Sequence, residues 1–254
     1  MASFAEYSQE FQTIRMRRED GILEMRFHTQ GGPLQWSLLP HGELERAFLA
    51  VGRDRANEVV ILTGTGNDFS GPRIGEEGHA HTREPVTPQE WDRIYWEGKH
   101  LLMNLLNIEV PVISAVNGPA LRHAEIPLLS DIVLAAEEAE FQDSAHFNGG
   151  LVPGDGVHVV FPLLMGVTRA RYFLLTGQTI NARQALEYGL VNEVLPRAEV
   201  LSRAWFLARQ LMRRPALIRR YSRVLLTQDL KRRMHDLLGY GLALEGLGAS
   251  QRVG

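Results

Sequence analysis

Hydrophobic and charged residues alternate in the first clear element of the chain. Apolar side chains stand at every second position of residues 14–17 and again of residues 23–28. Asp20 and Gly21 lie between the two runs, and this dipeptide is typical of a tight hairpin turn. The pattern predicts a β-hairpin with one face exposed to water.

Apolar helical stripes then alternate with short apolar runs that are typical of buried strands. One helical stretch places Leu44, Phe48 and Val51 on a single face. Helices are expected at residues 41–54 and 87–109, and strands at residues 58–64, 110–118 and 131–136. Because helices and strands alternate, we expect a largely parallel sheet.

The last third of the chain is predicted to be mostly helical. Its expected elements are helices at residues 168–177 and 181–189, a short strand at 191–195, and almost only helix from about residue 197. We therefore expect an α/β core over residues 1–196 and a C-terminal helical region over residues 197–254.

Composition narrows the possible functions. The 254 residues are 44% hydrophobic and 22% charged with a net charge of −3, which favours neither nucleic acid nor a membrane as a partner. There is no cysteine, so disulfides, thiolate catalysis and cysteine-bound zinc are excluded. The N-terminus carries no signal-peptide pattern, and no apolar run is long enough to span a membrane. A cytoplasmic enzyme is the expectation.

Two glycine-containing turns follow predicted buried strands, at residues 64–72 and 117–125. In alternating α/β proteins, loops at the carboxyl ends of strands hold ligands, and backbone N–H groups freed by glycine can bind an anion. Glycine motifs of this kind are weak signals. A ligand site and a pair of plain tight turns are equally good readings of the spacing.

His146 and Asp155 flank a glycine- and proline-rich turn. A carboxylate on one imidazole nitrogen can fix the tautomer, so that the other nitrogen removes a proton from water. A solvated loop is the alternative, and Asp143 is an equally possible partner for His146. The chain has neither a serine nucleophile elbow nor an HExxH motif, so this dyad would activate water directly.

Three further residues are candidates for a site. His123 lies within the second glycine turn, where a structural histidine is the commoner case. Glu245 falls on the apolar stripe of the last predicted helix, so that it needs an ion pair or a pocket. Trp36 follows a glycine-rich loop and either packs in the core or points its indole N–H into a cavity.

Two other polar features are weaker candidates. His79 and His81 could bind a metal, but a third ligand is not evident and a solvated loop is favoured. The basic run 213–233 could bind RNA or phosphate. It keeps apolar residues at helical spacing, so we expect the charges to form the solvated face of a packed helix. Those apolar residues are Leu217, Tyr221 and Val224.

Four stretches in order carry a family resemblance: EVVILTGTGNDFSG, EVPVISAVNGPA, SDIVLAAEEAEF and GLVPGDG. Together with the helical tail they resemble the enoyl-CoA hydratase/isomerase (crotonase) superfamily over nearly the whole chain. The resemblance implies a spiral of ββα repeats, a C-terminal helical region used for trimerisation, and an oxyanion hole of backbone N–H groups from the two glycine turns. A homotrimer, or a hexamer made of two trimers, would follow.

The loops differ from the hydratase pattern in an informative way. The first reads FSGPRI and the second LRHAE, with Glu125 at the position of one family glutamate and His146 at the position of the other. The sequence is most similar to the β-diketone hydrolase branch, which includes 6-oxocamphor hydrolase, in stretches such as VVILTGTG, AVNGP, AEIP, VPGDG and RYFLLTGQ. By that resemblance the functional residues of the branch fall on Trp36, Gly71, His123, His146, Asp155 and Glu245.

The resemblance implies hydrolysis of a C–C bond in a cyclic β-diketone, a retro-Claisen reaction that gives a keto acid. The leaving carbanion is an enolate, so neither a metal nor a cofactor is expected. His146 with Asp155 would activate water, His123 and Trp36 would stabilise the oxyanion, and Glu245 would orient substrate or water. The alternatives are a CoA-dependent hydratase or isomerase that uses Glu125, and a non-catalytic RNA-binding homologue that uses the basic helix.

Overall fold

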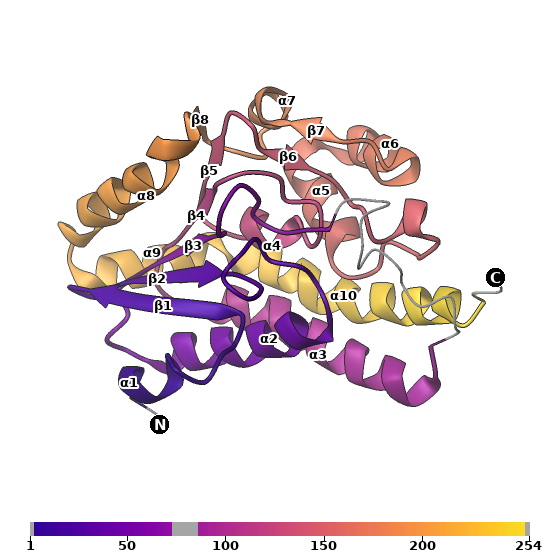
Figure 1. The fold of residues 1–254 in the computed structure, drawn as a ribbon, viewed down its shortest axis with the longest axis horizontal. Helices are drawn as coiled ribbons and strands as arrows, with labels where there is room; N and C mark the ends of the chain where they lie inside the picture. The colour runs from indigo at the N-terminus through magenta and orange to yellow at the C-terminus, as the bar shows by residue number, and fades with distance from the viewer. Residues whose placement is uncertain (1–2, 73–85, 252–254) are drawn as a thin grey trace.

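The computed structural model describes residues 3–72 and 86–251, and its centre is a six-stranded sheet (Figure 1). The strands lie in the order β1-β2-β3-β4-β5-β8. Only the β1–β2 pair is antiparallel, while the other pairs are parallel, as the alternation of helices and strands predicted. The strands are β1 (Ile14–Glu19), β2 (Ile22–Phe27), β3 (Val59–Thr63), β4 (Val112–Val116), β5 (Ile132–Ala136) and β8 (Glu193–Leu195).

The predicted hairpin is present and its turn explains its register. Asp20 and Gly21 both have positive φ, at 49° and 82°, as a two-residue turn that follows the twist of the strands requires. This turn pairs Ile14 with Phe27 across the two strands. The central strands β3 and β4 are buried at every position, which agrees with their continuous apolar runs.

A second layer of very short extended segments runs beside the main sheet. Single bridges join Gln35 to Gly71, Ser70 to Ala120, and Ala120 to Phe141. The row ends in the two-stranded pair of β6 (Glu140–Phe141) and β7 (Ile180–Asn181). The repeated unit of long strand, short extended segment and helix is the crotonase-like spiral of ββα repeats, so the predicted fold class is confirmed.

Long helices cover the sheet where the apolar stripes predicted them. α2 (Leu38–Arg53) and α3 (Pro88–Asn107) pack against each other, and α3 begins where Thr87 caps the helix reciprocally with Glu90. α8 (Arg197–Met212) packs on β3, β4 and β5, so the C-terminal region returns to the sheet. In Figure 1, α2 and α3 lie below the sheet and α8 lies at its upper left.

In Figure 1, α5 (Val157–Met165) and α6 (Val167–Thr176) lie to the right of the sheet, α7 (Ala182–Glu187) lies above it, and α1 (Phe4–Tyr7) lies at the lower left. α5, rich in apolar residues and without a clear polar face, was not predicted, whereas α6 and α7 were. The short elements are α1 (Phe4–Tyr7), α4 (Glu125–Leu128), the 3₁₀ turn η1 (Phe147–Gly149), α5 (Val157–Met165), α6 (Val167–Thr176) and α7 (Ala182–Glu187). The chain ends in α9 (Ala216–Leu226) and α10 (Gln228–Ala249), and α10 packs on α3 and α5.

The basic run 213–233 was predicted to place its charged residues on the solvated face of a helix, and this prediction was wrong for α9. In α9 the arginines at 219, 220 and 223 are buried, whereas Leu217 and Tyr221 are exposed at 59% and 57%. Val224, the third apolar residue of that stripe, is partly exposed. The buried arginines form ion pairs with three partly exposed acids from earlier parts of the chain, namely Glu58, Glu109 and Asp131. Ion pairing to distant carboxylates therefore outweighs the burial of the apolar stripe, which sequence periodicity cannot show.

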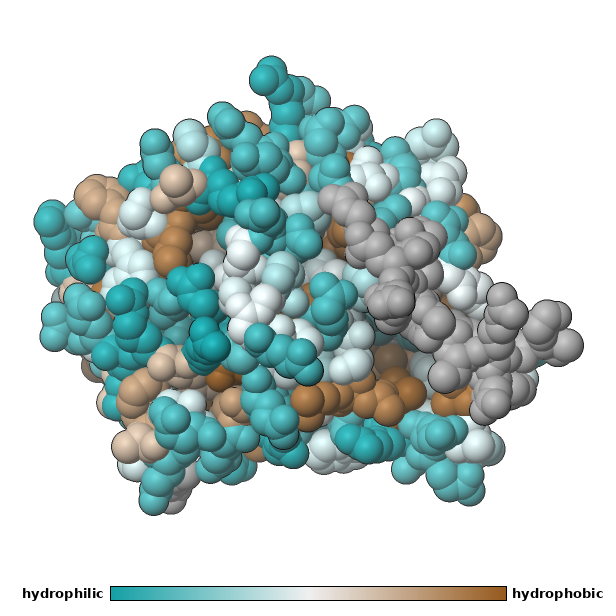
Figure 2. All heavy atoms as spheres, viewed as in Figure 1, coloured by the Kyte–Doolittle hydropathy of each residue, from teal (hydrophilic) through white to brown (hydrophobic). Residues whose placement is uncertain are grey.

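The surface seen in Figure 2 is mostly hydrophilic, with an apolar band over the region where Figure 1 draws α2, α3 and α10. Among the described residues, no helix combines the length and the apolar character that a membrane span would require.

Candidate active site

Six ionisable side chains from separate parts of the chain form one cluster, in which five are buried and His123 is partly buried. It lies where loops beyond the carboxyl ends of the parallel strands meet α10, the usual ligand position in alternating α/β proteins. The members are His123, Glu125, Asp143, His146, Asp155 and Glu245. Each of the four carboxyl groups keeps one buried oxygen without a hydrogen-bond partner in the described parts of the chain. Unsatisfied buried acceptors are costly and point to a functional role.

His146 is held by Asp143 rather than by the acid we expected. The Oδ1 atom of Asp143 lies 2.5 Å from Nδ1 of His146, and both side chains are only 4% exposed. The resemblance implied Asp155 as the partner that acts with His146, and the loop sequence left Asp143 as an alternative. The geometry places Asp143 at Nδ1 and Asp155 at the other nitrogen of the ring. The reason is local, because the turn before η1 brings residue 143 back onto residue 146 through a one-turn spacing that the loop sequence did not reveal.

The other nitrogen of His146 faces two acids. Nε2 lies 3.4 Å from Oδ2 of Asp155 and 3.3 Å from Oε1 of Glu245. This arrangement depends on glycine: a Cβ on Gly154 would lie 2.2 Å from the carbonyl oxygen of Gly241 in α10 and 2.8 Å from the Cβ of Glu245. Only a residue without a side chain lets the turn before α5 approach α10 so closely.

His123 joins this cluster through the same aspartate. Its Nδ1 lies 3.2 Å from Oδ2 of Asp155 and 2.7 Å from Oε1 of Glu125. The backbone of His123 has a φ of 50°, which is uncommon for a residue with a side chain and is often found at functional sites. The imidazole stacks on Trp36 with ring centroids 3.9 Å apart. The structure therefore brings together five of the six residues that the resemblance indicated: Trp36, His123, His146, Asp155 and Glu245.

The electrostatics of the cluster shift the pKa values of His146 and His123 in opposite directions. Burial alone lowers the pKa of His146, but the carboxylates of Asp143, Asp155 and Glu245 outweigh it and raise that pKa well above its ordinary value. Burial lowers the pKa of His123 to about 3, against the opposing Asp155. Burial also raises the pKa of Glu245 to about 7, although the nearby His146 lowers it. His146 is thus the stronger base, while His123 stays neutral.

The spacing of one part of the cluster allows a test for a metal ion. Ligand atoms of His123, Glu125 and Asp155 lie within 4.8 Å of one another. Two ligands of a tetrahedral zinc at ~2.0–2.2 Å would be about 3.3 Å apart. The 2.7 Å separation between Nδ1 of His123 and Oε1 of Glu125 is shorter and corresponds to a hydrogen bond. The spacing of His123, Glu125 and Asp155 is therefore that of a hydrogen-bonded group.

The backbone N–H groups near the end of the first glycine turn, at residues 69–71, are all bonded within the protein. The N–H of Gly71 donates to the carbonyl of Leu34 at 2.9 Å, and its carbonyl accepts from the N–H of Trp36. The N–H of Ser70 donates to Pro119, and Pro72 has no N–H. Gly71, which the resemblance implied as a substrate-binding residue, also ties the segment that carries Trp36 to the second layer; its contact with substrate stays a prediction. The N–H groups of residues 70 and 71 are thus bonded within the protein and are not free to bind an oxyanion.

Two other glycines of these turns have a packing role. A Cβ on Gly118 would lie 1.7 Å from the carbonyl oxygen of Asn67, and one on Gly64 would lie 2.5 Å from Oδ1 of Asn117. The two turns therefore need glycine in order to touch each other. Of the two readings left open by the sequence, tight packing is the one that this geometry supports for Gly64 and Gly118.

Sequence reasoning missed a second histidine–acid pair beside Trp36. Nδ1 of His41 lies 3.0 Å from Oε2 of Glu97, and the His41 ring centroid is 6.1 Å from those of Trp36 and His123. The signal was present: His41 precedes Leu44 by three residues and so continues the apolar stripe of α2. His79 and His81, the weaker metal candidates, lie outside the described residues.

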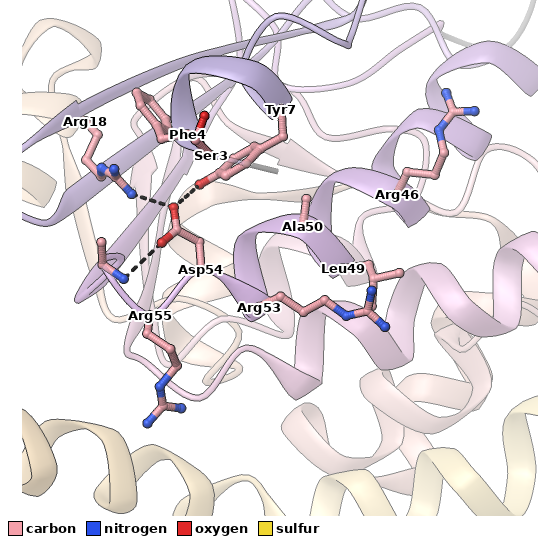
Figure 3. A pocket seen from close by; sticks show the side chains of 11 residues that line it. Ser3, Phe4, Tyr7, Arg18, Arg46, Leu49, Ala50, Arg53, Asp54 and Arg55 are labelled. Carbon is pink, nitrogen blue, oxygen red and sulfur yellow. Dashed lines mark hydrogen bonds and ion pairs between the residues drawn. The ribbon is translucent and has the colours of Figure 1, made fainter. Parts of the chain in front are cut away.

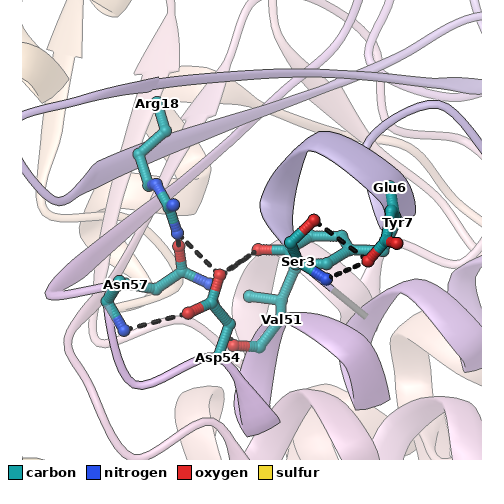
Figure 4. A network of polar contacts seen from close by, with 8 residues as sticks. Ser3, Glu6, Tyr7, Arg18, Val51, Asp54 and Asn57 are labelled. Atoms are coloured by element: carbon teal, nitrogen blue, oxygen red, sulfur yellow. Dashed lines mark hydrogen bonds and ion pairs between the residues drawn. The ribbon is translucent and has the colours of Figure 1, made fainter. Parts of the chain in front are cut away.

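A separate surface pocket of about 580 Å³ lies by the N-terminus, and no member of the buried cluster lines it (Figure 3). Its polar groups bond to one another: Oδ2 of Asp54 accepts from Tyr7 at 2.9 Å and from Arg18 at 2.6 Å (Figure 4). Asn57 donates to the same tyrosine and to the carbonyl of Val51. Burial raises the pKa of Tyr7 to about 12. This network fastens α1 to the end of α2.

Fold and site together define an enzyme of the crotonase superfamily. The family model described as enoyl-CoA hydratase/isomerase matches residues 18–240, and the chain belongs to this family.

Curated relatives share part of the chain. Carnitinyl-CoA dehydratase of Shigella flexneri is 30% identical over 172 residues, which are 67% of this chain and 63% of that protein. A probable enoyl-CoA hydratase of Mycobacterium tuberculosis is 31% identical over 170 residues, or 65% and 59% of the two chains. The matched stretch thus spans less than two thirds of either relative. Hydroxycinnamoyl-CoA hydratase-lyase of Pseudomonas fluorescens is 28% identical over 84% of this chain and 78% of that protein.

Among solved structures, a β-diketone hydrolase from the cyanobacterium Anabaena sp. PCC 7120 superposes with a TM-score of 0.89. It is 48% identical, with 96% of this chain and 97% of that chain covered, and it is bound to (S)-3-oxocyclohexyl acetic acid. An enoyl-CoA hydratase/isomerase from Mycobacterium paratuberculosis has a TM-score of 0.86 at 25% identity, with 95% and 96% of the two chains covered.

Proposed function

We propose that this enzyme hydrolyses a C–C bond in a cyclic β-diketone and releases a keto acid. One observation carries the proposal: the buried base His146 is held at Nδ1 by Asp143 and turns Nε2 towards Asp155 and Glu245. The stacked rings of His123 and Trp36 lie beside it, since Asp155 also contacts His123. The 48% identity to a β-diketone hydrolase supports the assignment.

The reaction needs one proton transfer in each direction. Nε2 of His146 removes a proton from water while the water oxygen bonds to one carbonyl carbon. The C–C bond then breaks, and its electron pair becomes the enolate of the other carbonyl. The proton on His146 returns to the enolate carbon. One water is consumed and nothing is oxidised or reduced, so the chemistry balances with no cofactor.

Side chains replace the backbone donors in this scheme. The N–H groups of Ser70 and Gly71 are already bonded within the protein. In this scheme His123, whose lowered pKa keeps it neutral, and the indole N–H of its neighbour Trp36 donate to the oxygen on which negative charge develops. A neutral imidazole donates without itself gaining or losing charge.

The charge of the cluster sets the pH dependence. The three surrounding carboxylates raise the pKa of His146, so that its base form increases as pH rises. The rate at limiting substrate should therefore climb from neutral towards alkaline pH, and the acid limb should report His146. The neighbouring Glu245, with its pKa raised to about 7, titrates in the same range.

The proposal is tested with a screen of symmetric cyclic 1,3-diketones, monocyclic and bicyclic, followed by chiral analysis of the keto-acid product. Turnover of a prochiral bicyclic diketone is expected to give one enantiomer, because a water held at one position attacks only one of the two otherwise equivalent carbonyls. His146→Ala should lower kcat by ~10²-fold or more, whereas the circular dichroism spectrum stays unchanged. No turnover of any diketone, or full activity in that variant, contradicts the proposal.

A CoA-dependent hydratase is the second candidate, since the curated relatives act on CoA-linked substrates by name and Glu125 is buried at the site. Loss of the conjugated absorbance of crotonyl-CoA would detect it. We expect no such turnover, because the engaged backbone of residues 70–71 removes donors that a thioester oxygen would need.

We also propose that the chain assembles into a homotrimer or a hexamer. α9 exposes a continuous apolar face whose members are 57–77% exposed: Leu217, Ile218, Tyr221, Leu225 and Leu226. Exposed apolar faces of this kind mark protein–protein contacts. A second copy of the chain is the partner that the helical tail suggests.

A further inference from the structure

Glu125 is a fully buried acid that has no role in the hydrolysis proposed above. It is the first residue of α4, and its side chain is 0% exposed. Its Oε2 has no hydrogen-bond partner within residues 3–72 and 86–251. Its Oε1 lies 2.7 Å from Nδ1 of His123, closer than the 3.2 Å between Oδ2 of Asp155 and the same nitrogen.

The hydrogen bond between Glu125 and His123 contains one proton, and burial decides where it belongs. An ionised Glu125 would be a carboxylate in the protein interior, with one oxygen unpartnered and Asp155 nearby. Both features penalise the charged form. Burial and Asp155 accordingly raise the pKa of Glu125 well above its ordinary value, although a hydrogen bond from its own backbone N–H and the nearby His146 lower it.

A neutral carboxyl group can place its hydrogen on only one oxygen. On Oε2 the O–H would be buried without an acceptor, whereas on Oε1 it points to Nδ1 of His123. Nδ1 then accepts, so the single imidazole proton must sit on Nε2. The low pKa of His123, about 3, excludes a second imidazole proton near neutral pH.

We propose that Glu125 acts as a carboxylic acid and is a positioning residue: its O–H donates to Nδ1 of His123 and fixes the tautomer that carries the proton on Nε2. This inference rests on the proposed function, in which that N–H donates to the substrate oxygen. Asp155 opposes it, since a carboxylate at Nδ1 favours the other tautomer. That tautomer would turn a lone pair, instead of a donor, towards a developing oxyanion.

Nitrogen NMR on the resting enzyme tests the tautomer without any substrate. The protein is labelled with ¹⁵N-histidine, and the signals of His123 among the nine histidines are assigned from their loss in His123→Gln. Wild type should show a protonated Nε2 and an unprotonated Nδ1. Glu125→Gln should keep this pattern, because the amide N–H donates to Nδ1, and Glu125→Leu should reverse it in favour of Asp155. A protonated Nδ1 in the wild-type enzyme overturns the proposal.

Kinetics on a cyclic 1,3-diketone give the second readout. Removal of one oxyanion donor typically costs ~10²–10³ in kcat, so we expect that loss in Glu125→Leu and a change of no more than about threefold in Glu125→Gln. If Glu125 instead transferred a proton in the reaction, the Gln variant would lose ~10²–10⁴. A Gln variant as inactive as the Leu variant therefore refutes the positioning role.

The two experiments fail separately. Absence of diketone turnover would remove the proposed function but leave the NMR result on the resting enzyme valid. Turnover with His123 protonated on Nδ1 would keep the hydrolase and remove the role of Glu125. Should the Leu variant not fold, wild type and Glu125→Gln still decide both questions, since the first must show Nε2–H and the second must stay active.

Discussion

The missing side chain of Gly154 lets Asp155 and Glu245 lie close to His146, and adding one methyl group in Gly154→Ala tests this. In Gly154→Ala the new Cβ would lie 2.2 Å from the carbonyl oxygen of Gly241. Heavy atoms in contact sit ~3.5 Å apart, so the turn and α10 must separate by roughly 1 Å. The contacts of His146 with Asp155 and Glu245, now 3.4 and 3.3 Å, would lengthen beyond 4 Å if the shift falls along them.

This displacement has two measurable consequences. Overpacking of this kind costs about 1–3 kcal/mol, which for a chain of this size lowers Tm by ~2–12 °C. A shift of 1 Å in a catalytic group costs on the order of 10² in rate. We therefore expect kcat on a cyclic 1,3-diketone to fall by about that factor, in an enzyme that remains folded at 25 °C.

Gly150 supplies the matched control. It lies in the same loop with a φ of +79°, and a Cβ there would meet nothing within 4 Å. Gly150→Ala therefore adds backbone strain of ~1–2 kcal/mol without a clash and should keep kcat near the wild-type value. If Gly154→Ala retained wild-type kcat and Tm, or if both variants lost activity equally, close approach of the turn to α10 would not be what positions the acids.

Three further predictions concern the cluster and α9. Asp143→Asn should lower kcat by on the order of 10³, because the amide cannot stabilise the imidazolium of His146. If steady-state kinetics showed a loss below tenfold, Asp155 would be the residue that stabilises the imidazolium. Glu245→Gln removes a negative charge beside His146 and should lower the pKa of that histidine. The acid limb of the kcat/KM profile should therefore move to lower pH by up to about one unit. If the limb does not move, a group other than His146 is titrating there. Replacing Leu225 with lysine should produce smaller species in sedimentation experiments, and an unchanged assembly would place the subunit contact elsewhere.

Much of the fold could be predicted from the sequence because its signals are local. The Asp20-Gly21 turn, the alternation of apolar runs and the stripe of α2 each depend on residues within a few positions of one another. α5 was not predicted because it is apolar on nearly all sides and offers no period to detect. The arginines of α9 are buried by carboxylates far along the chain, which no local pattern contains.

The candidate site shows the same division between local and distant information. The sequence alone determined which residue types are available: a histidine in the HFNGG segment, an aspartate in the VPGDG turn, and an acid on the apolar stripe of the last helix. A periodic pattern is enough to mark Glu245 as an acid that needs a partner.

Only the tertiary structure decided which groups touch. In the folded protein Asp143 contacts Nδ1 of His146, Asp155 lies near both His123 and His146, and the backbone N–H of Gly71 is already hydrogen-bonded. The physical reason is that hydrogen bonds act over about 3 Å, whereas segments separated by up to a hundred residues must be packed before any two of their atoms come that close. Protonation follows from the same packing: the carboxylates gathered around His146 raise its pKa and make it a strong base, whereas burial lowers the pKa of His123 and keeps it neutral.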